Sequence, residues 1–256
     1  MSARWNDIFQ LPDAALAGSK RVPKTMLVKQ AALTKHEQKT LEKMRRLEHF
    51  ATATKATTRM LPRVDDERDI QSIIFLRCEM AGTSQAVAEV ARLVHKCFPN
   101  PTVIMQDVKD RLCISVSLTR KSHAERGATV MEAVESTGLF DGKAPEWQPF
   151  LDAIAYPRLP QSDLYEYLNA MATNVMLSRA IDALGFYPQS RGNDQQRILT
   201  LVDRYDALKT DVNRLYEERR SRDITLNESA KLRMRIRKAE NQQNAILNEI
   251  KELCNG

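Results

Sequence analysis

The chain has 256 residues, 43% of them hydrophobic and 28% charged, a composition that is typical of a globular protein and excludes wholesale disorder. Lys and Arg number 39 against 33 Asp and Glu, so the net charge of +6 allows a polyanionic partner without requiring one. No stretch reaches the roughly 18 to 20 consecutive apolar residues of a membrane helix, and the first residues lack the apolar core of a secretory signal. We therefore expect a cytoplasmic protein without a membrane partner.

Several enzyme classes lack their sequence signals. None of the 8 Gly forms a dinucleotide-binding or P-loop motif. The Cys residues show no C-x-x-C spacing, and Cys78, Cys97 and Cys113 sit among apolar residues, as buried reduced thiols do. His95 and Cys97 would supply only two of the four ligands that a zinc site normally needs. We expect no cofactor and no metal, although a pair of catalytic carboxylates would leave no spacing signal.

Positive charge is concentrated near the N-terminus. Residues 1–63 contain 13 basic and 5 acidic residues, a net charge of +8, whereas residues 64–192 contain 13 and 17, a net charge of −4. Basic surfaces displace counterions from nucleic acid, so Lys20, Arg21 and Lys24 are candidate phosphate contacts. Solvated lysines on a helix face would give the same pattern.

The N-terminal elements are predicted from apolar residues and caps. Residues 1–33 are expected to form a basic arm pinned by Trp5, Ile8 and Phe9. Residues 34–37, Thr-Lys-His-Glu, have the form of a capping box, which predicts the start of a helix. Leu41, Met44 and Leu47 continue that helix as an apolar stripe, and it is expected to fray over residues 51–58.

A β-α-β-β unit follows. Residues 70–80 are rich in β-branched and aromatic residues on both faces, which favours a central strand, and a helix with Val87, Val90 and Val94 ends before Pro99. Residues 102–106 and 111–118 are predicted strands. Residues 128–136 are ambiguous between strand and helix. From Trp147 the pattern turns helical, with a helix capped by Ser162 and ending at Gly185.

The last 64 residues show two heptad patterns, which predict an antiparallel coiled-coil hairpin with about 27 residues, or about 40 Å, in each arm. Asn193 would cap the first helix, residues 219–224 would form the turn, and the capping box at residues 225–228 would open the second helix. Antiparallel layering places Tyr205 opposite Ala239 and Gln243 opposite Leu201. The predicted seam is Ile198, Leu201, Tyr205, Leu208, Val212, Leu215, Leu232, Ile236, Ala239, Gln243, Ile246, Ile250 and Leu253.

The second heptad helix also carries a basic cluster of five residues within eight positions, without an acidic one. Such a cluster exceeds the positive charge of a balanced helix surface and is a further candidate for phosphate contact. Pairing between Arg235 and Asp211 across the hairpin would neutralise part of it. The cluster is Lys231, Arg233, Arg235, Arg237 and Lys238.

Together these patterns predict an α+β protein with three parts. A small mixed-sheet domain with a basic arm covers residues 1–145, a helical connector covers residues 146–190, and the coiled-coil hairpin covers residues 191–256.

The order of several short motifs resembles that of the bacterial domain-of-unknown-function 4391 family. The motifs are Phe9-Gln10-Leu11-Pro12, Arg21-Val22-Pro23-Lys24, the strand at residues 73–80, Phe98-Pro99-Asn100-Pro101 and Leu118-Thr119-Arg120-Lys121. They cover residues 8–140, and Met44-Arg45-Arg46-Leu47 and Gly138-Leu139-Phe140 depart from the family pattern. The resemblance makes residues 128–136 a strand, and its basic pair, Arg120 and Lys121, joins the candidate phosphate contacts.

Members of that family resemble accessory proteins that are encoded together with helicases, methyltransferases and nucleases in bacterial anti-phage defence islands. The resemblance therefore implies a non-catalytic accessory subunit of a nucleic-acid-processing defence complex, with a protein partner and duplex DNA as expected contacts. A metal-dependent nuclease is the first alternative, with carboxylates drawn from Asp65, Asp66, Glu67, Asp69 and Glu79. A self-associating scaffold is the second, since Gln243, Leu247 and Tyr216 permit hairpins to pair.

Overall fold

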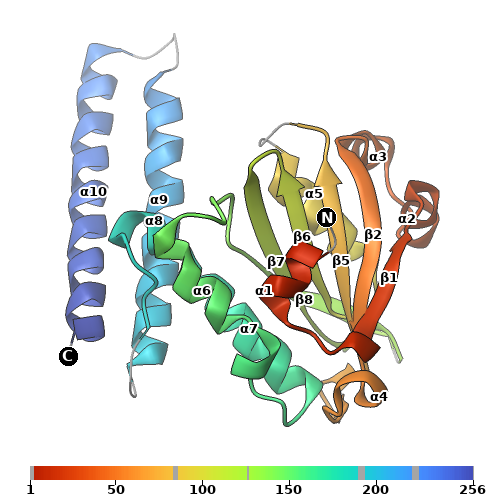
Figure 1. Cartoon of the computed structure of the whole chain (residues 1–256). Helices are drawn as coiled ribbons and strands as arrows, with labels where there is room; N and C mark the ends of the chain where they lie inside the picture. Colours follow the sequence, from red (N-terminus) through yellow and green to blue (C-terminus); the bar gives the residue numbers. More distant parts are fainter. Residues whose placement is uncertain (1–2, 83–85, 126, 190–193, 221–224, 256) are drawn as a thin grey trace. The chain divides into compact units, whose positions relative to one another are not determined.

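The computed structural model describes the whole chain except residues 1–2, 83–85, 126, 190–193, 221–224 and 256 (Figure 1). The chain divides into two compact units, Met1–Val175 and Met176–Gly256. Each unit is described by itself below. The division into three parts stays a prediction.

The first unit is built on a mixed sheet of six strands in the order β1-β2-β5-β6-β7-β8 (Figure 1). Neighbouring strands are antiparallel except for β5 and β6, which are parallel and joined through helix α5 (Val87–Lys96). This confirms an N-terminal mixed sheet and the expected β-α-β-β order. The strands are β1 (Leu16–Arg21), β2 (Met44–Ala53), β5 (Ile73–Met80), β6 (Thr102–Val108), β7 (Arg111–Lys121) and β8 (Thr129–Ser136).

The N-terminal segment is part of the fold and not an arm. Its described elements are α1 (Ala3–Phe9), a 3-10 turn (Asp13–Ala15), the edge strand β1 and α2 (Lys24–Gln30). Trp5 and Phe9 are buried, as expected from their pattern. Gly18, at a φ of +67°, and Ser19, at +54°, lie where the register between β1 and β2 shifts, and this bulge interrupts the outer edge of the sheet.

The helix predicted from residue 34 onward is too long. Thr34 and Glu37 form the capping box as predicted, but α3 (Lys35–Leu41) ends at Leu41. Met44 and Leu47 belong to β2, which pairs with β1 on one side and β5 on the other. Hydrogen bonds to strands on both sides of β2 outweigh the helical spacing of Leu41, Met44 and Leu47, which would cover only about two turns of a helix. The expected fraying region contains the end of β2 and a short helix, α4 (Lys55–Thr58).

One face of the sheet is covered by α2, α3 and α5. Leu27, Leu41, Val90 and Val94 from these helices form a core with Leu76 and with the other sheet residues that face them. Cys78 and Cys113 belong to this core, and Cys97 joins it from the residue that ends α5. The three thiols are buried and reduced, as their apolar surroundings predicted.

The opposite face is covered by α1 and by the segment after β8. Phe9 packs edge-on against Phe75 of β5 with ring centroids 5.7 Å apart. Phe140 stacks on Trp147 at 4.2 Å, and Phe150 meets both rings nearly perpendicularly. Trp147 ends a 3-10 turn (Pro145–Trp147) and Phe150 lies on α6 (Gln148–Ala153). Because both faces are covered, β5 and β6 are buried strands.

Several further elements complete the described chain before the two long helices at its end. A small hairpin of β3 (Arg63–Val64) and β4 (Asp69–Ile70) is followed by β5, so residues 70–80 are not one strand. Residues 128–136 contain the edge strand β8 and no helix. Two helices replace the single one predicted: α7 (Leu164–Ser178), which crosses the boundary between the two units, and α8 (Ile181–Leu184), which belongs to the second unit. Gly185 closes α8 at a φ of +78°. A 3-10 turn (Tyr156–Arg158) precedes them.

Two long helices dominate the second unit, α9 (Gln195–Arg219) and α10 (Leu226–Asn255). They share an apolar cluster that contains Val212, Leu215, Leu232, Ile236 and Ala239. Arg197 near the start of α9 pairs with Glu249 near the end of α10, so the helices run in opposite directions (Figure 1). The side chains of Ile198, Leu201, Tyr205, Ile246 and Ile250 are also buried, whereas Leu208, Gln243 and Leu253 are partly buried.

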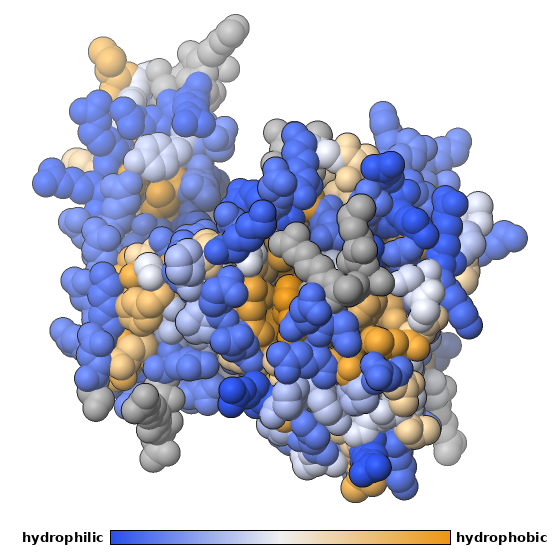
Figure 2. Space-filling model, viewed as in Figure 1, coloured by the Kyte–Doolittle hydropathy of each residue, from blue (hydrophilic) through white to orange (hydrophobic). Residues whose placement is uncertain are grey.

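The ends of these helices agree with the capping signals that fall within the described residues. Thr225 and Glu228 form the reciprocal bonds of a capping box before α10, as predicted. The predicted cap Asn193 and most of the predicted turn at residues 219–224 lie outside the described residues. Hydrophilic side chains dominate the visible surface of both units (Figure 2).

Candidate nucleic-acid interface

The basic cluster of α10 lies on an exposed stretch of helix. Lys231, Arg233, Arg235, Arg237 and Lys238 are all exposed. Between residues 231 and 248 the only carboxylate is that of Glu240, which accepts a hydrogen bond of 2.8 Å from the hydroxyl of Tyr216 on α9. The cluster therefore forms a positively charged, exposed surface on α10, and the single acid that follows it before residue 249 is bonded to Tyr216.

The arginines of α9 and of its C-cap residue behave differently, because several have carboxylate partners. Arg197 pairs with Glu249 at 2.6 Å, and Arg220 pairs with Glu217 at 3.0 Å. Arg214 pairs with Asp211 and with Glu218. Asp211 thus pairs within its own helix. The sequence predicts that it pairs with Arg235 instead, and this prediction is wrong.

Within the described part of the chain, none of the five α10 cations forms an ion pair within 4 Å. Lys231 interacts electrostatically with Glu228, whose pKa is lowered chiefly by the hydroxyl and amide of Thr225 and only in the last place by Lys231. The charge of the cluster is therefore available to an external anion.

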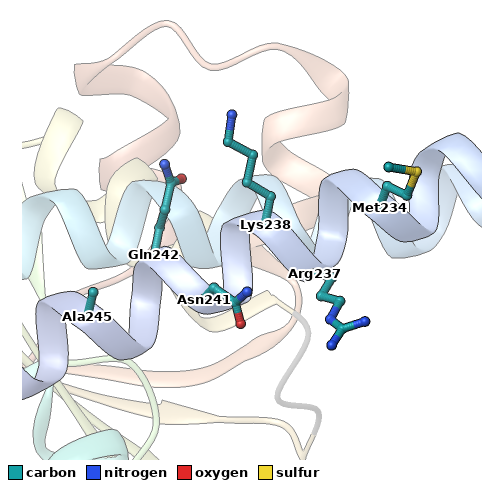
Figure 3. A pocket seen from close by; sticks show the side chains of 6 residues that line it. All are labelled: Met234, Arg237, Lys238, Asn241, Gln242 and Ala245. Carbon is teal, nitrogen blue, oxygen red and sulfur yellow. The ribbon is translucent and has the colours of Figure 1, made fainter.

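An open hollow runs along the outward face of α10 (Figure 3). It is lined by Met234, Arg237, Lys238, Asn241, Gln242 and Ala245, all from this helix. Lys238 and Gln242 point to one side of the helix and Arg237 to the other (Figure 3). Met234 is 75% exposed, which is unusual for a large apolar side chain. The outward face thus combines a neutral centre with basic flanks.

The N-terminal candidates lie on the first unit. Lys20 and Arg21 end the edge strand β1 and are exposed, and Lys24 begins α2, where its ammonium group donates to the carbonyl of Glu42 at 3.5 Å. Glu37 of α3 is bonded to Lys96 at 2.8 Å, and the pKa of its carboxyl falls to about 2, mainly because of Lys96 and then of Thr34. This surface is basic as well, although its cations come from several elements.

Arg120 and Lys121 at the end of β7 have internal partners. The ammonium group of Lys121 donates to the carbonyl of Asp65, and the guanidinium of Arg120 donates to the carbonyl of Lys121 at 3.0 Å. Both side chains are half-buried. Their polar groups hold the β3–β4 hairpin and the strand end, which makes them weaker candidates for phosphate contact than the α10 cluster.

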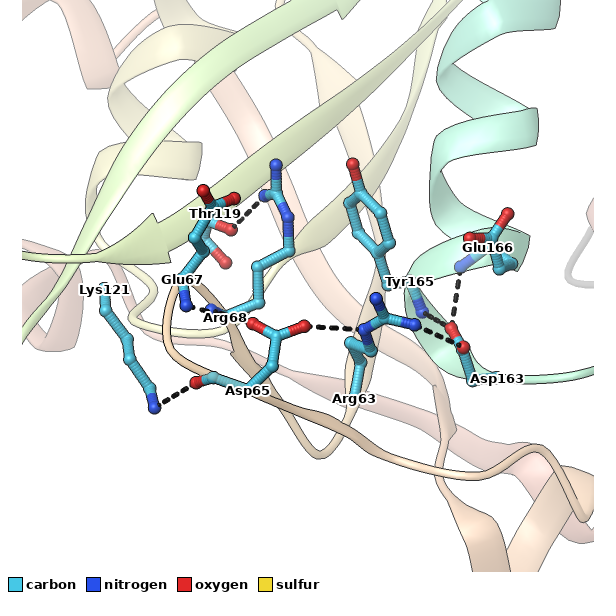
Figure 4. A network of polar contacts seen from close by, with 9 residues as sticks. All are labelled: Arg63, Asp65, Glu67, Arg68, Thr119, Lys121, Asp163, Tyr165 and Glu166. Carbon is cyan, nitrogen blue, oxygen red and sulfur yellow. Dashed lines mark hydrogen bonds and ion pairs between the residues drawn. The ribbon is translucent and has the colours of Figure 1, made fainter.

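The acidic row proposed for a nuclease forms a closed turn (Figure 4). Asp65 accepts from Arg63 Nε at 2.7 Å and from the amides of Glu67 and Arg68 at 3.0 and 2.8 Å. These bonds, Arg63 first, lower the pKa of Asp65. Glu79 pairs with Arg45 at 3.0 Å. A metal ion would have to displace these donors from Asp65, so the turn is explained by its structural bonds.

The same hairpin is fixed to α7. Arg63 contacts Asp163 at 3.4 Å, and Arg68 donates to the carbonyl of Thr119 and lies 4.2 Å from the centre of the Tyr165 ring (Figure 4). Asp163 accepts from the amides of Tyr165 and Glu166 at 2.8 Å each. Asp163, and not Ser162 as predicted, is therefore the cap of α7.

A buried charge network was not found from the sequence. Arg77 on β5 bridges Glu48 on β2 at 3.6 Å and Asp107 on β6 at 2.8 Å. Trp5 Nε1 donates to the same oxygen of Asp107 at 3.1 Å, and Arg46 pairs with Glu48 at 2.6 Å. Charged residues in the middle of three apolar strands were the available signal. Every member has a partner, so the network ties α1 to the sheet.

A second buried network surrounds His95 between α5 and the sheet. Its Nδ1 is bonded to the hydroxyl of Thr102 at 2.5 Å and its Nε2 to that of Ser115 at 2.9 Å. Burial lowers the pKa of His95 to about 3. A pocket of about 360 Å³, lined in part by His95, Cys97 and Met131, lies beside it. Both ring nitrogens are occupied, and burial raises the pKa of Cys97 to about 11, so neither group is set up to attack a ligand.

Among the described residues there is no group of three or more His, Cys, Asp or Glu side chains that could hold a metal ion. No helix in the described part is long and apolar enough to span a bilayer. In the same part of the chain, the five cations of the α10 cluster are exposed and form no ion pair within 4 Å.

The fold and this surface define a mixed α/β protein with a long, basic, exposed helix. A family described as a domain of unknown function, DUF4391, matches residues 9–242, and the chain belongs to this family. The match confirms the resemblance and extends it beyond residues 8–140 through α9 and into α10. No similar curated protein and no similar solved structure was found.

Proposed function

We propose that the protein is a non-catalytic accessory subunit of a bacterial anti-phage defence complex that acts on nucleic acid. In this role it docks a helicase, methyltransferase or nuclease of the same system and contacts duplex DNA through α10. The resemblance to companions of such enzymes supports the first part. The second part rests on one observation, the five exposed cations of α10 that lack carboxylate partners among the described residues.

The pattern of ion pairs carries the DNA-binding part of the proposal. A helix that is only solvated gains from neutralising its own charges, as α9 does where Arg214 pairs with Asp211 and Glu218. In α10 five like charges within eight residues repel one another, which disfavours the free helix. A row of phosphates removes this repulsion and releases counterions.

The arrangement of the two helices supports a docking role. We propose that α9 and α10 form an antiparallel coiled-coil hairpin along the predicted seam, with Gln243 as a polar residue that fixes the register. The hairpin presents the basic flanks of α10 on a stiff rod. Support comes from the shared apolar cluster and from the Arg197–Glu249 pair at the ends of the two helices.

DNA binding is tested by fluorescence anisotropy of the full chain with a labelled duplex of about 25 base pairs at several salt concentrations. If all five cations meet phosphates, the logarithm of the association constant falls with the logarithm of salt concentration with a slope of about −4 to −5. The triple variant Arg233→Gln, Arg235→Gln, Arg237→Gln is expected to reduce that slope by about 3.

The matched control is Arg197→Gln, Arg214→Gln, Arg220→Gln, which removes the same charge from three arginines that have carboxylate partners. We expect the control to keep most of the affinity and the slope. Equal losses in the two triple variants would mean that only net charge matters and would exclude α10 as the interface. Absence of binding to any duplex at low salt would refute the DNA contact itself.

The docking part requires a separate experiment. The tagged chain is co-expressed with the products of neighbouring genes, purified at high salt to remove DNA-mediated contacts, and analysed by mass spectrometry. Stoichiometric recovery of a helicase, methyltransferase or nuclease would support the accessory role. Retention of nuclease activity by the isolated chain, with metal present, would contradict the non-catalytic assignment.

A further inference from the structure

We infer that α10 enters the major groove of duplex DNA with its outward face, so that its two basic flanks meet the two phosphate strands and its neutral centre faces the base edges. This inference rests on the proposed DNA contact and specifies how it is made. The observation behind it is the placement of the basic residues on two sides of Met234 (Figure 3).

The helical positions separate the cluster into two flanks. At about 100° per residue, Arg233 and Arg237 lie about 100° and 60° from Met234 on one side. Lys238, Lys231 and Arg235 lie about 40°, 60° and 100° from Met234 on the other side. The buried seam residues Leu232, Ile236 and Ala239 lie on the opposite side of α10, where they pack against α9. Contact with α9 therefore leaves both flanks exposed.

A single flat row of cations would suit one phosphate strand, but two flanks around a neutral strip suit a groove. The major groove of B-DNA is about 12 Å wide, which admits one α-helix with its side chains. Residues 231–245 span about 21 Å, which is comparable to the length of the recognition helices that lie in the major groove in known DNA-binding motifs. Acidic side chains would prevent this approach, and the only one in the segment, Glu240, is bonded to Tyr216.

The neutral strip has the chemistry to contact base edges. Asn241 lies within about 20° of Met234, and Ala245 lies about 20° away on the other side. Asn and Gln side chains match the donor and acceptor of adenine in the major groove, and apolar side chains contact the thymine methyl group. Asn241 is exposed, and among the described residues no hydrogen bond occupies its amide. Recognition through so few base contacts gives a preference for A·T pairs and not a unique sequence.

Groove entry is tested by comparing ligands with equal phosphate charge. The full chain is titrated with a B-form DNA duplex, with double-stranded RNA of the same length, and with the DNA duplex carrying glucosylated hydroxymethylcytosine. The sugar blocks the major groove, and the A-form major groove is too deep and narrow for a helix. We expect the double-stranded RNA and the glucosylated duplex to bind at least about tenfold more weakly than the plain DNA duplex. A minor-groove competitor such as netropsin should have no effect on binding to the plain duplex.

Variants separate base contact from phosphate contact. Asn241→Ala should lower the affinity for an A·T-containing duplex without changing the salt slope, because a neutral side chain displaces no counterion. The control is Gln196→Ala, which removes an exposed amide from α9.

Four outcomes would overturn the inference. Equal binding of all three ligands means phosphate contact outside the groove and leaves the proposed DNA contact intact. Displacement of DNA by netropsin places the helix in the minor groove. Binding of an acidic peptide, polyglutamate, with the affinity of B-DNA means that α10 docks an acidic protein. Failure to bind any duplex at low salt refutes the proposed function together with this inference.

Discussion

Trp5 and Asp107 are 102 positions apart in the sequence, and the indole nitrogen of Trp5 donates a hydrogen bond of 3.1 Å to the carboxylate of Asp107. The same carboxylate oxygen accepts from Arg77 at 2.8 Å. One acidic side chain on β6 thus connects the first helix of the chain to the central strand β5. The N-terminal residues are therefore needed for a complete sheet face.

This relationship predicts a large loss of stability from Asp107→Ala. Arg77 is 15% exposed and would keep only the more distant carboxylate of Glu48, so we expect the free energy of unfolding to fall by about 3 kcal/mol. Trp5→Phe, which removes the donor and keeps an aromatic ring, should lower it by about 2 kcal/mol. Urea denaturation followed by circular dichroism measures both. The exposed neighbour Asp110→Ala should change it by less than about 0.5 kcal/mol, and an equal loss there would contradict the role of the network.

A second prediction concerns the cap of α7. Asp163→Ala removes two hydrogen bonds to helix amides and the contact with Arg63, and should lower the free energy of unfolding by about 1 to 2 kcal/mol. Asp163→Asn keeps the capping oxygen and should lose less than half of this. Ser162→Ala serves as the control. A larger loss for Ser162→Ala than for Asp163→Ala would reverse the assignment of the cap.

The packing of α9 against α10 is tested by two neighbouring side chains. Ile236 is 3% exposed in the shared cluster and Met234 is 75% exposed on the outward face. Ile236→Ala should lower the free energy of unfolding by about 2 to 4 kcal/mol, because it leaves a cavity between the helices. Met234→Ala should change it by less than about 0.5 kcal/mol. Thermal melts of helical circular dichroism would show a reversed order if α10 packed through its other face.

His95 gives a prediction about pH. Its pKa is about 3 in the folded protein, because burial disfavours the charged ring, and about 6.5 when unfolded. Above pH 6.5 the ring is neutral in both states and stability does not depend on it. Below pH 6.5 the unfolded chain takes up a proton that the folded chain does not, so stability falls as pH falls.

The size of this effect is about 1.4 kcal/mol for each pH unit between pH 6 and pH 4. His95→Gln lacks the ionisable ring and should not show this loss. For each unit by which the pH falls in this range, the unfolding free energy of the variant should therefore rise by about 1.4 kcal/mol relative to that of the unsubstituted chain. Urea titrations at pH 7.5, 6 and 5 measure it. A difference that is constant with pH would mean that His95 has the same pKa in the folded and the unfolded protein.

The sequence predicts features that depend on neighbouring residues. The capping boxes at Thr34 and Thr225 are correct because a cap is decided within four residues. The buried thiols, the helix at residues 87–96 and the basic cluster of α10 are also readable from local composition. The family resemblance correctly made residues 128–136 a strand, which periodicity alone left open.

Features that depend on distant partners were missed. Met44 and Leu47 fit a helical spacing, and only pairing with β1 and β5 makes them part of a strand. Glu48, Arg77 and Asp107 come together because β2, β5 and β6 are neighbours in the sheet, an order that no spacing within the chain encodes. The cap of α7 was misplaced by one residue, since Ser162 and Asp163 are both good caps and only their geometry distinguishes them.

The burial of three of the four cysteines makes the native chain easy to label. Cys78, Cys97 and Cys113 are enclosed in the core of the first unit, and burial raises their pKa values, so little reactive thiolate forms at neutral pH. Cys254, at the end of α10, is partly exposed. A maleimide fluorophore should therefore attach to one end of the basic helix without any substitution, and its energy transfer to a labelled duplex would report the direction in which α10 lies along DNA.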